Sequence, residues 1–424
     1  MGRPMSMTLS EKIIAQACGR SNVNSGDIVT CKVDLAMMHD SSGPRMAGKM
    51  LDELGVPVWD IDKLVVITDH YINDENPDHK KIQEHARAWC KSHKVKYFIR
   101  EQGICHTVLP EYGHLKPGMF CVGGDSHSTT GGAFGAFMIG IGSSDLVGVL
   151  ATGEIWVRVP ETVCMKLKGT LQPGIAAKDI MLKLCSKYGM MGFNYQAIEY
   201  RGPVVEKMSV EERMTLTNMA AELGAKTGIV APDDITQAYL SHVGITAIDA
   251  KRWQSDDEAD FTKTITLNCS SLVPYVAAPS SPENSLSISE FSQITLNQAY
   301  VGACTGAKLD DLRMVAVVLK GKKVSKNIDF FVAPATLNIR KEAEKEGILK
   351  VLVEAGAKVL PSGCGGCIGL GAARLGENVV GISTTNRNFV GRAGHKSSAL
   401  YLASPYTVAA SAITGKITDP RHFF

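Results

Sequence analysis

Three cysteines in the C-terminal part of the chain have a spacing that could hold a metal centre. Cys364 and Cys367 form a Cys-x-x-Cys pair, and Cys304 lies just before a stretch with helical periodicity. The two thiolates of such a pair can reach one metal centre, and the dipole of a following helix favours the thiolate form of a cysteine. The pair alone is also typical of a redox dithiol or of half a structural zinc site, so only the combination with Cys304 indicates a cluster.

Three thiolate ligands carry a specific chemical consequence. They are one short of the four that close a tetrahedral site. An iron–sulfur cluster held by Cys304, Cys364 and Cys367 would therefore leave one iron without a protein ligand, and that iron could act as a Lewis acid on a substrate oxygen.

Acid–base groups lie next to the ends of expected strands. Asp69 directly precedes His70, and Asp125 stands two residues before His127. A carboxylate beside an imidazole raises its basicity and orients it for proton transfer. His106 follows a third such junction. A single histidine is more often structural than catalytic, but three at this kind of position indicate acid–base chemistry.

Two further pairs could bind a substrate. Asn218 and Glu222 are four residues apart and would share one helix face, although an ordinary exposed helix pair has the same spacing. Arg387 and Arg392 stand on either side of a glycine in a segment with few acidic residues. Arginine forms two-point bonds with carboxylates, so the pair could clamp a di- or tricarboxylate; the alternative is two surface arginines.

The elements that position these residues repeat one pattern, in which an apolar strand is followed by a small-residue loop and then a helix. The pattern predicts a helix over Leu309–Leu319 and a small-residue helix after Cys367. Such alternation is typical of α/β layers with parallel strands, where ligands bind at the carboxyl ends of the strands. The expected strands are Leu64–Thr68, Met119–Val122, Ala299–Val301 and Ala357–Leu360.

The length of 424 residues suggests about three domains, at roughly 150 residues each. Ser280–Ser289 is rich in serine and predicts a linker, and a softer boundary lies near Val159–Glu161. The expected domains are residues 1–160, 161–279 and 290–424.

Composition narrows the class of protein. A net charge of +2 does not indicate a protein that binds nucleic acid or an anionic membrane through its overall charge. No stretch of the sequence predicts a membrane span or a secretory signal. Without such signals the cytoplasm is the expected location, and in a reducing compartment the 11 cysteines should be thiols. Two glycine-rich segments miss the spacing of nucleotide-binding loops: Gly302–Leu309 and Gly369–Gly376.

Taken in order, the motifs resemble those of the aconitase superfamily: Asp125-Ser-His127, Cys304-Thr, Cys364-x-x-Cys367 and Asn386-Arg-Asn-Phe-x-Gly-Arg392. The segment Val33–Pro44 is similar to the large subunits of isopropylmalate dehydratase and homoaconitase. The resemblance extends over nearly the whole chain. It implies three α/β/α-type domains around a central iron–sulfur cluster, without the swivelling fourth domain.

The resemblance also implies roles for individual residues. Cys304, Cys364 and Cys367 would hold a [4Fe–4S] cluster. Asp69 and His70 would protonate the leaving hydroxyl. The residues expected around the bound water and the substrate are His106, Asp125, His127 and Glu222. The residues expected to bind substrate or hold the site are His39, Ser126, Asn218, Asn386, Arg387 and Arg392.

The implied activity is that of a hydro-lyase subunit, first of all for 3-isopropylmalate in leucine biosynthesis. The chain reads Cys304-Thr305-Gly306 where the family usually has asparagine after the threonine, so homoaconitate, dimethylmalate and maleate stay open as substrates. The family's swivelling domain, which supplies the catalytic base, is expected on a separate small subunit. A non-catalytic RNA-binding regulator and a zinc-binding structural protein are alternatives from other classes.

Overall fold

The computed structural model describes residues 6–72 and 76–424, and these form two compact units. The first contains the chain up to Arg100 together with Val108–Lys168 and Phe193–Leu267. The second contains Glu101–Thr107, Gly169–Gly192 and Asn268–Phe424. Neither unit is one continuous stretch of sequence, because two short segments of the N-terminal half pack with the C-terminal part.

A five-stranded sheet in the order β4-β3-β2-β5-β6 is the centre of the first unit. All its neighbouring strands are parallel. A second sheet has the order β10-β9-β8-β11, and β1 pairs with β7 in a separate antiparallel ribbon. The strands are β1 Ile28–Lys32, β2 Leu35–His39, β3 Leu64–Thr68, β4 Tyr97–Arg100, β5 Phe120–Gly123, β6 Phe137–Gly140, β7 Glu154–Arg158, β8 Thr162–Lys168, β9 Ala197–Arg201, β10 Thr227–Ile229 and β11 Lys263–Asn268.

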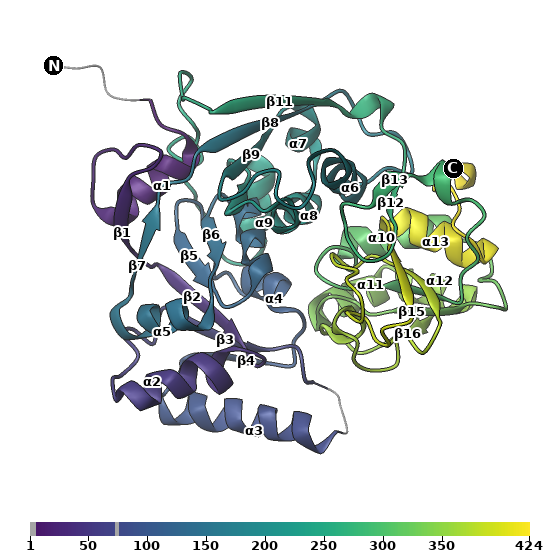
Figure 1. Cartoon of the computed structure of the whole chain (residues 1–424), viewed down its shortest axis with the longest axis horizontal. Helices are drawn as coiled ribbons and strands as arrows, with labels where there is room; N and C mark the ends of the chain where they lie inside the picture. The colour runs from purple at the N-terminus through teal and green to yellow at the C-terminus, as the bar shows by residue number, and fades with distance from the viewer. Residues whose placement is uncertain (1–5, 73–75) are drawn as a thin grey trace. The chain divides into compact units, whose positions relative to one another are not determined.

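The helices of the first unit cover these sheets (Figure 1). They are α1 Leu9–Cys18, α2 Lys49–Leu54, α3 Pro77–Ser92, α4 Cys105–Glu111, α5 Ser143–Thr152, α7 Pro203–Lys207, α8 Val210–Asn218 and α9 Asp234–His242, with a π-helix over Gly43–Gly48 and 3-10 helices over Ser126–Phe134 and Met219–Leu223. The first turn of α4 belongs to the second unit and the rest of this helix to the first.

The second unit is built on a seven-stranded sheet in the order β13-β12-β18-β17-β14-β15-β16. Its middle strands are parallel, and helices α10 and α13 lie side by side against it (Figure 1). The strands are β12 Tyr275–Ala277, β13 Ser285–Ser287, β14 Gln298–Val301, β15 Asp329–Val332, β16 Lys358–Val359, β17 Val380–Ser383 and β18 Ala399–Leu402. The helices are α6 Ala177–Tyr188, α10 Leu309–Leu319, α11 Leu337–Lys345, α12 Ile348–Ala355 and α13 Pro405–Thr414, with 3-10 helices over Cys269–Ser271, Ile288–Phe291, Gly365–Ile368 and Pro420–Phe423.

Local sequence signals explain several of these boundaries. Helix α1 begins at a capping box, in which the Thr8 hydroxyl accepts from the Glu11 amide and the Glu11 carboxylate accepts from the Thr8 amide. The helix ends at Gly19, whose φ of 71° lies in the left-handed region that favours glycine. Helix α13 begins with Pro405 at its first turn and likewise ends at a left-handed glycine, Gly415.

Several sequence predictions are confirmed. The parallel α/β sheets are present, and both β3 and α10 have the predicted bounds. The predicted helix after Cys367 is wrong, because only a short 3-10 helix over Gly365–Ile368 forms there. Glycines follow this turn, and Gly369 and Gly371 have positive φ values of 72° and 68°, which a helix does not allow.

The predicted linker is also wrong. Part of Ser280–Ser289 forms strand β13, which pairs antiparallel with β12 inside the seven-stranded sheet. Strand β13 is at the edge of this sheet, where polar residues are tolerated because one side faces solvent. The division into residues 1–160, 161–279 and 290–424 stays a prediction, and the two units are what the contacts define.

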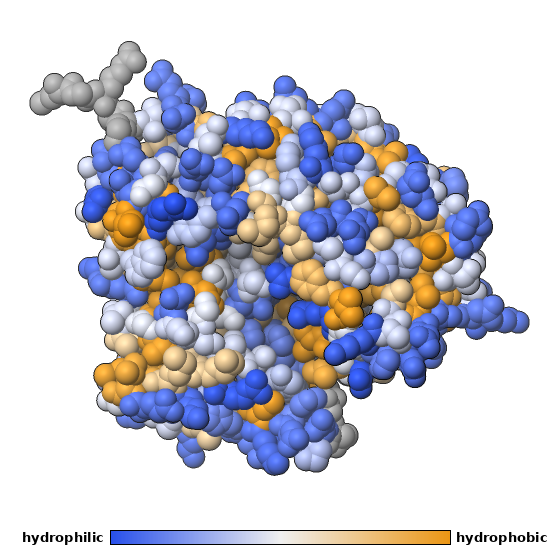
Figure 2. Space-filling model, in the orientation of Figure 1, coloured by the Kyte–Doolittle hydropathy of each residue, from blue (hydrophilic) through white to orange (hydrophobic). Residues whose placement is uncertain are grey.

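No helix of the described residues combines the length and the apolar character needed to cross a bilayer. On the face drawn in Figure 2, hydrophobic residues are interspersed with hydrophilic ones.

Candidate functional site

His70 is held by two buried carboxylates of the first unit. Its Nδ1 lies 2.5 Å from Asp69 Oδ1 and 3.6 Å from Asp40 Oδ1. Burial lowers the pKa of His70, but the negative charges of Asp69, Asp40 and Asp125 outweigh burial and raise it to about 9. His70 is therefore protonated at neutral pH and can act as an acid.

Asp40 is a member of this group that the sequence did not indicate. It is fully buried at the end of β2, and its carboxylate accepts from the main-chain amides of Asp69, His70 and Tyr71. Gln83 on α3 donates a further hydrogen bond to it. Burial raises the pKa of Asp40 first, and the nearby charge of Asp69 raises it further. The side chain thus fixes the turn that presents His70.

His39 stacks on His70, with ring centroids 4.2 Å apart and an angle of 17° between the planes. Its Nδ1 accepts from the Ser41 amide, which leaves the proton of the neutral ring on Nε2. Nε2 is buried and lies 3.7 Å from Asp125 Oδ2, beyond hydrogen-bond distance. His39 therefore has a buried donor that no described protein atom satisfies, which suits its predicted role in substrate binding.

His127 and Glu222 form a second buried pair in the first unit. His127 Nε2 lies 2.8 Å from Glu222 Oε1, and the His127 amide donates to Asp125 Oδ1. The Asn218 side chain donates to Thr130 Oγ1 in the same 3-10 helix that contains His127. Asn218 ends α8 and Glu222 lies in the following 3-10 helix, so the alternative of an exposed helix pair is wrong: both residues are fully buried. Ser126, the first residue after Asp125, is exposed.

The three predicted cysteine ligands all belong to the second unit. Cys304 follows β14, and Cys364 and Cys367 lie in one turn, in which the Cys367 amide donates to the Cys364 carbonyl. The side-chain amide of Asn386 contacts two of the three: its Nδ2 is 3.5 Å from Cys304 Sγ and its Oδ1 is 3.6 Å from Cys367 Sγ. Asn386, predicted to bind substrate, is thus a bridge between two sulfurs.

None of the 11 cysteines is paired in a disulfide. The three at this site fit an iron–sulfur cluster, because one amide side chain and one short turn gather them from segments about 60 residues apart in the chain.

A buried lysine that the sequence did not indicate connects the two halves of this site. Lys178 on α6 is 1% exposed. Its Nζ donates to the carbonyls of Thr384 and Thr385, each at 2.5 Å, and lies 3.3 Å from Thr305 Oγ1. Burial lowers its pKa to about 7, while the charge of Cys304 acts in the opposite direction. Lys178 ties the segment before Asn386 to the residue after Cys304.

Gly306, the departure from the family pattern, has a structural partner. A Cβ atom on residue 306 would lie 2.1 Å from Thr384 Cβ and 2.2 Å from Thr384 Oγ1. The Thr384 hydroxyl accepts from the Gly302 amide and donates to the Gly302 carbonyl. Thr384 therefore fills the space beside Gly306, and its two hydrogen bonds with Gly302 hold the loop that contains Cys304.

The two predicted arginines lie in the same segment of the second unit. Arg387 and Arg392 are both partly buried, and the Arg387 guanidinium lies 6.0 Å from the Phe389 ring. Arg392 Nε is buried and has no hydrogen-bond partner among the described residues. A Cβ on Gly369, just after the Cys364–Cys367 turn, would lie 3.2 Å from the Arg392 carbonyl, so the arginine segment packs against the cysteine turn.

His106 lies in the first turn of α4, within the short segment that belongs to the second unit. Two backbone contacts hold the residues before His106 in the second unit. The Ile104 amide donates to the Ala335 carbonyl, and Gly103 forms a β-bridge with Thr336. A Cβ on Gly103 would lie 2.3 Å from the Ala335 oxygen, and only glycine allows this approach.

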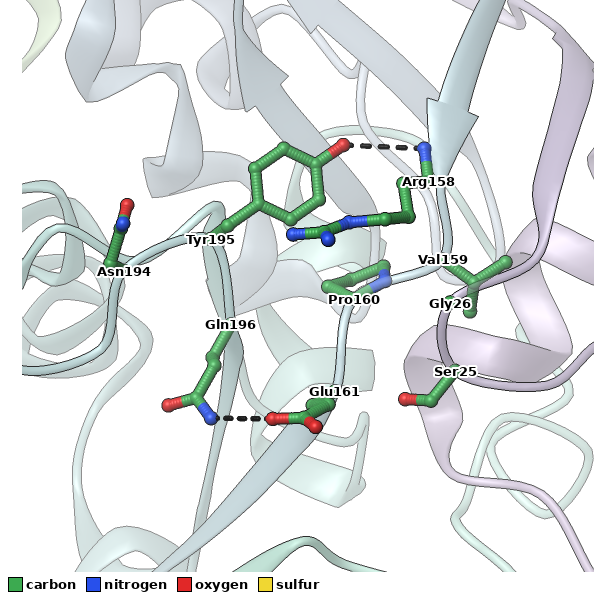
Figure 3. Close-up of a pocket in the computed structure, with 9 residues that line it drawn as sticks. All are labelled: Ser25, Gly26, Arg158, Val159, Pro160, Glu161, Asn194, Tyr195 and Gln196. Atoms are coloured by element: carbon green, nitrogen blue, oxygen red, sulfur yellow. Dashed lines mark hydrogen bonds between the residues drawn. The ribbon is translucent and has the colours of Figure 1, made fainter.

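A separate pocket of about 240 Å³ in the first unit contains none of the predicted residues. Figure 3 shows its lining, in which the Tyr195 hydroxyl accepts from the Arg158 amide and Gln196 donates to Glu161. The Arg158 guanidinium lies 4.8 Å from the Tyr195 ring. The lining residues belong to none of the acid–base groups described above.

Comparison with known proteins adds an independent finding. The model of the aconitase family (aconitate hydratase) matches residues 11–294 and 288–415. The chain is 43% identical over 422 residues to a 3-isopropylmalate dehydratase large subunit of Methanopyrus kandleri, covering 99% of this chain and 100% of that one. It is 40% identical to a protein of the same name from Aquifex aeolicus, covering 98% and 97% of the two chains.

The methanogen homoaconitase large subunit of Methanocaldococcus jannaschii is also similar, at 41% identity over 97% of this chain and 99% of that one. These matches cover both units and every candidate site residue described above. The chain belongs to the aconitase family.

Proposed function

We propose that this chain is the cluster-bearing large subunit of a hydro-lyase that dehydrates and rehydrates a hydroxy dicarboxylate, with 3-isopropylmalate as its substrate in leucine biosynthesis. The observation that carries the proposal is the contact of one Asn386 side chain with the sulfurs of Cys304 and Cys367, with Cys364 in the same turn as Cys367. The names of the relatives from Methanopyrus kandleri and Aquifex aeolicus support the choice of substrate.

Cys304, Cys364 and Cys367 would hold a [4Fe–4S] cluster, which when bound supplies a Lewis-acid iron for the substrate hydroxyl. The other eight cysteines form no disulfide, which supports a reducing compartment, and we propose that the protein is in the cytoplasm.

His70 is the proposed acid that protonates the leaving hydroxyl. Its pKa of about 9 keeps it charged at neutral pH, and Asp69 holds its Nδ1 so that Nε2 carries the transferable proton. The buried pair of His127 and Glu222 is proposed to orient the water that leaves or enters, together with Asp125 and His106.

The substrate carboxylates are proposed to bind to Arg387, Arg392 and His39, with Ser126 contributing a hydroxyl. Two of these residues have buried donors without a described protein partner, Arg392 Nε and His39 Nε2. A bound carboxylate would satisfy such donors, whose burial without a partner costs about 1–3 kcal/mol each. Asn218 and Asn386 are proposed to hold the site, because their side chains bond to protein groups.

The base that removes the carbon-bound proton is proposed to lie on a separate small subunit. His70 is protonated and serves the hydroxyl, so it is in the wrong state to accept that proton. The relatives named above carry the words "large subunit" in their names, which supports a second chain. That partner would also contact the variable group of the substrate and so decide between isopropylmalate, homoaconitate, dimethylmalate and maleate.

The cluster assignment is tested by anaerobic reconstitution of the chain and of its Cys304→Ser, Cys364→Ser and Cys367→Ser variants. Iron, sulfide and visible absorbance should indicate one four-iron cluster in the parent and a large loss in each variant. Cys185→Ser is the matched control, since Cys185 is a buried cysteine of the same unit outside the site. Full clusters in all three ligand variants would refute the assignment, and stoichiometric zinc in the parent would favour a structural metal site.

The activity is tested with the reconstituted chain alone and with its candidate small subunit, on all four substrates. We expect turnover only with both chains and fastest with 3-isopropylmalate. Arg392→Lys should keep the cluster and lose most of the turnover, because lysine cannot form the planar two-point bond. Full activity of the large chain alone would contradict the proposed division of the site.

A further inference from the structure

The ring of Tyr300 lies between the two cysteine-bearing segments of the second unit. A Cβ on Gly302, two residues before Cys304, would lie 2.1 Å from Tyr300 Cζ. A Cβ on Gly366, one residue before Cys367, would lie 3.1 Å from the same carbon. Glycine at both places leaves room for the ring, so the phenol end of Tyr300 reaches the place where the segments meet.

The Tyr300 hydroxyl is buried without a full hydrogen bond. The residue is 4% exposed, and its oxygen has no hydrogen-bond partner within the part of the chain that the structure describes. The amide of Gly366 faces the lone pairs of this oxygen, whereas no described group accepts the proton of its O–H. An unsatisfied buried hydroxyl costs about 1–3 kcal/mol and calls for a reason in a native protein.

The surroundings of the hydroxyl favour donation of its proton. Phe331, Ala333 and Ala373 pack around the ring, so the oxygen has apolar neighbours on the strand side. Burial raises the pKa of Tyr300, and the charges of Cys367 and Cys364 raise it further. Gly302 and Gly366, which lie against the phenol end, stand two residues before Cys304 and one residue before Cys367, so the cysteine sulfurs are the acceptors considered for its O–H.

We propose that the Tyr300 hydroxyl donates a hydrogen bond to sulfur at the metal centre, either to a thiolate of the Cys364–Cys367 turn or to a sulfide of the cluster held there. This inference rests on the proposed cluster. A donor to sulfur withdraws electron density, which raises the reduction potential of an iron–sulfur cluster and makes its oxidation less favourable. Tyr300 is thus a positioning and tuning residue, and it touches no substrate in this proposal.

The test is Tyr300→Phe, which removes only the hydroxyl and keeps the ring in place. Cluster-loaded parent and variant are compared by iron and sulfide content, by the midpoint potential of the cluster, and by the rate of bleaching in air. We expect equal iron content, a midpoint potential shifted to lower values, and bleaching about fivefold faster, which corresponds to the roughly 1 kcal/mol of one hydrogen bond. Tyr401→Phe is the matched control, because Tyr401 lies on β18 of the same sheet and its hydroxyl should not influence the cluster.

The outcomes separate this inference from the proposed function. A full cluster with unchanged potential and bleaching rate in Tyr300→Phe would overturn the inference and leave the cluster assignment standing. Equal shifts in Tyr300→Phe and Tyr401→Phe would also overturn it, since the effect would not come from a contact with sulfur. A parent chain that assembles no cluster would overturn the proposed function and this inference together.

Discussion

The side-chain amide of Asn386 joins Cys304 to Cys367, with its nitrogen 3.5 Å from one sulfur and its oxygen 3.6 Å from the other. These two cysteines come from segments that are 63 residues apart in numbering, so one side chain fixes their separation. When both sulfurs are thiolates, only the amide NH₂ can donate to them, and the oxygen must turn away or accept from another group. The contact therefore reports on the ionisation of the sulfurs as well as on their position.

Asn386→Ala should weaken the cluster site without unfolding the chain. We expect iron release to a chelator to be about tenfold faster, because a hydrogen bond to a charged group contributes about 1.5–3 kcal/mol. Asn388→Ala is the matched control in the same segment. Asn388 donates to the carbonyls of Ala278 and Leu400, so its loss should lower the melting temperature and leave iron release from the folded protein unchanged. Equal release rates in both variants would argue against a hydrogen bond from Asn386 to a sulfur of the loaded site.

Lys178→Met should destabilise the second unit even without metal. The substitution keeps the length of the side chain but leaves the buried carbonyls of Thr384 and Thr385 without their donor. We expect a loss of about 2–4 kcal/mol in urea unfolding of the metal-free chain. Lys183→Met on the same helix is the control, since Lys183 is partly exposed and its Nζ donates a single hydrogen bond, to the Tyr275 hydroxyl, so its loss should cost only about 1 kcal/mol. Similar losses in the two variants would disprove the special role of Lys178.

The pH dependence should follow His70. Its folded-state pKa is raised from 6.5 to about 9, so dehydration should decline as the pH rises through about 9 and the acid loses its proton. The stability that His70 contributes is complete below pH 6.5 and is lost as the pH rises towards 9. Asp69→Asn should move the alkaline decline of kcat/KM about 1–3 pH units lower, because the largest attractive charge is removed. If the alkaline decline of kcat/KM occurs at the same pH in Asp69→Asn as in the parent, His70 is not the acid.

Gly306→Ala should disturb the loop that carries Cys304. The added Cβ would meet Thr384 Cβ at 2.1 Å, and neither atom belongs to a flexible chain end that could move aside. Overpacking of this kind costs about 1–3 kcal/mol, measured by chemical unfolding. Gly376→Ala in the same unit is the control, since its nearest neighbour would be 3.5 Å away, and it should be nearly neutral. A neutral Gly306→Ala would show that the loop adapts and that Thr384 is no obstacle to a larger residue.

Much of the framework could be predicted from the sequence, because strand–loop–helix repeats are local signals. Strand β3 and helix α10 have the predicted bounds, and the strands beside them are parallel. The helix after Cys367 was predicted from its small residues, but glycines permit positive φ, and the chain uses this freedom to turn. The linker was predicted from its serines, although strand pairing at a sheet edge satisfies the backbone whatever the side chains are.

Three buried polar residues of the site could not be predicted, and the reason is the same for each. Asp40 and Lys178 bond to partners that are distant in sequence, and the acceptor proposed for Tyr300 is distant as well. The partners of Lys178, for example, are 127, 206 and 207 residues away. No periodicity or motif encodes such contacts, and a lysine in an ordinary amphipathic helix has the sequence signature of a surface residue. Cys364 and Cys367 could be singled out from the sequence because two candidate metal ligands in one turn have a short, recognisable spacing, and their role as ligands stays a prediction.

The way the second unit collects its parts also limits how this protein can be rearranged. A fragment beginning at residue 268 would contain Cys304, Cys364 and Cys367, but it would lack α6 with Lys178 and the segment ending at Thr107. The carbonyls of Thr384 and Thr385, and that of Ala335, would lose the donors that now satisfy them. The second unit is consequently no transferable module: a single recombination event or proteolytic cut cannot move it into another protein intact.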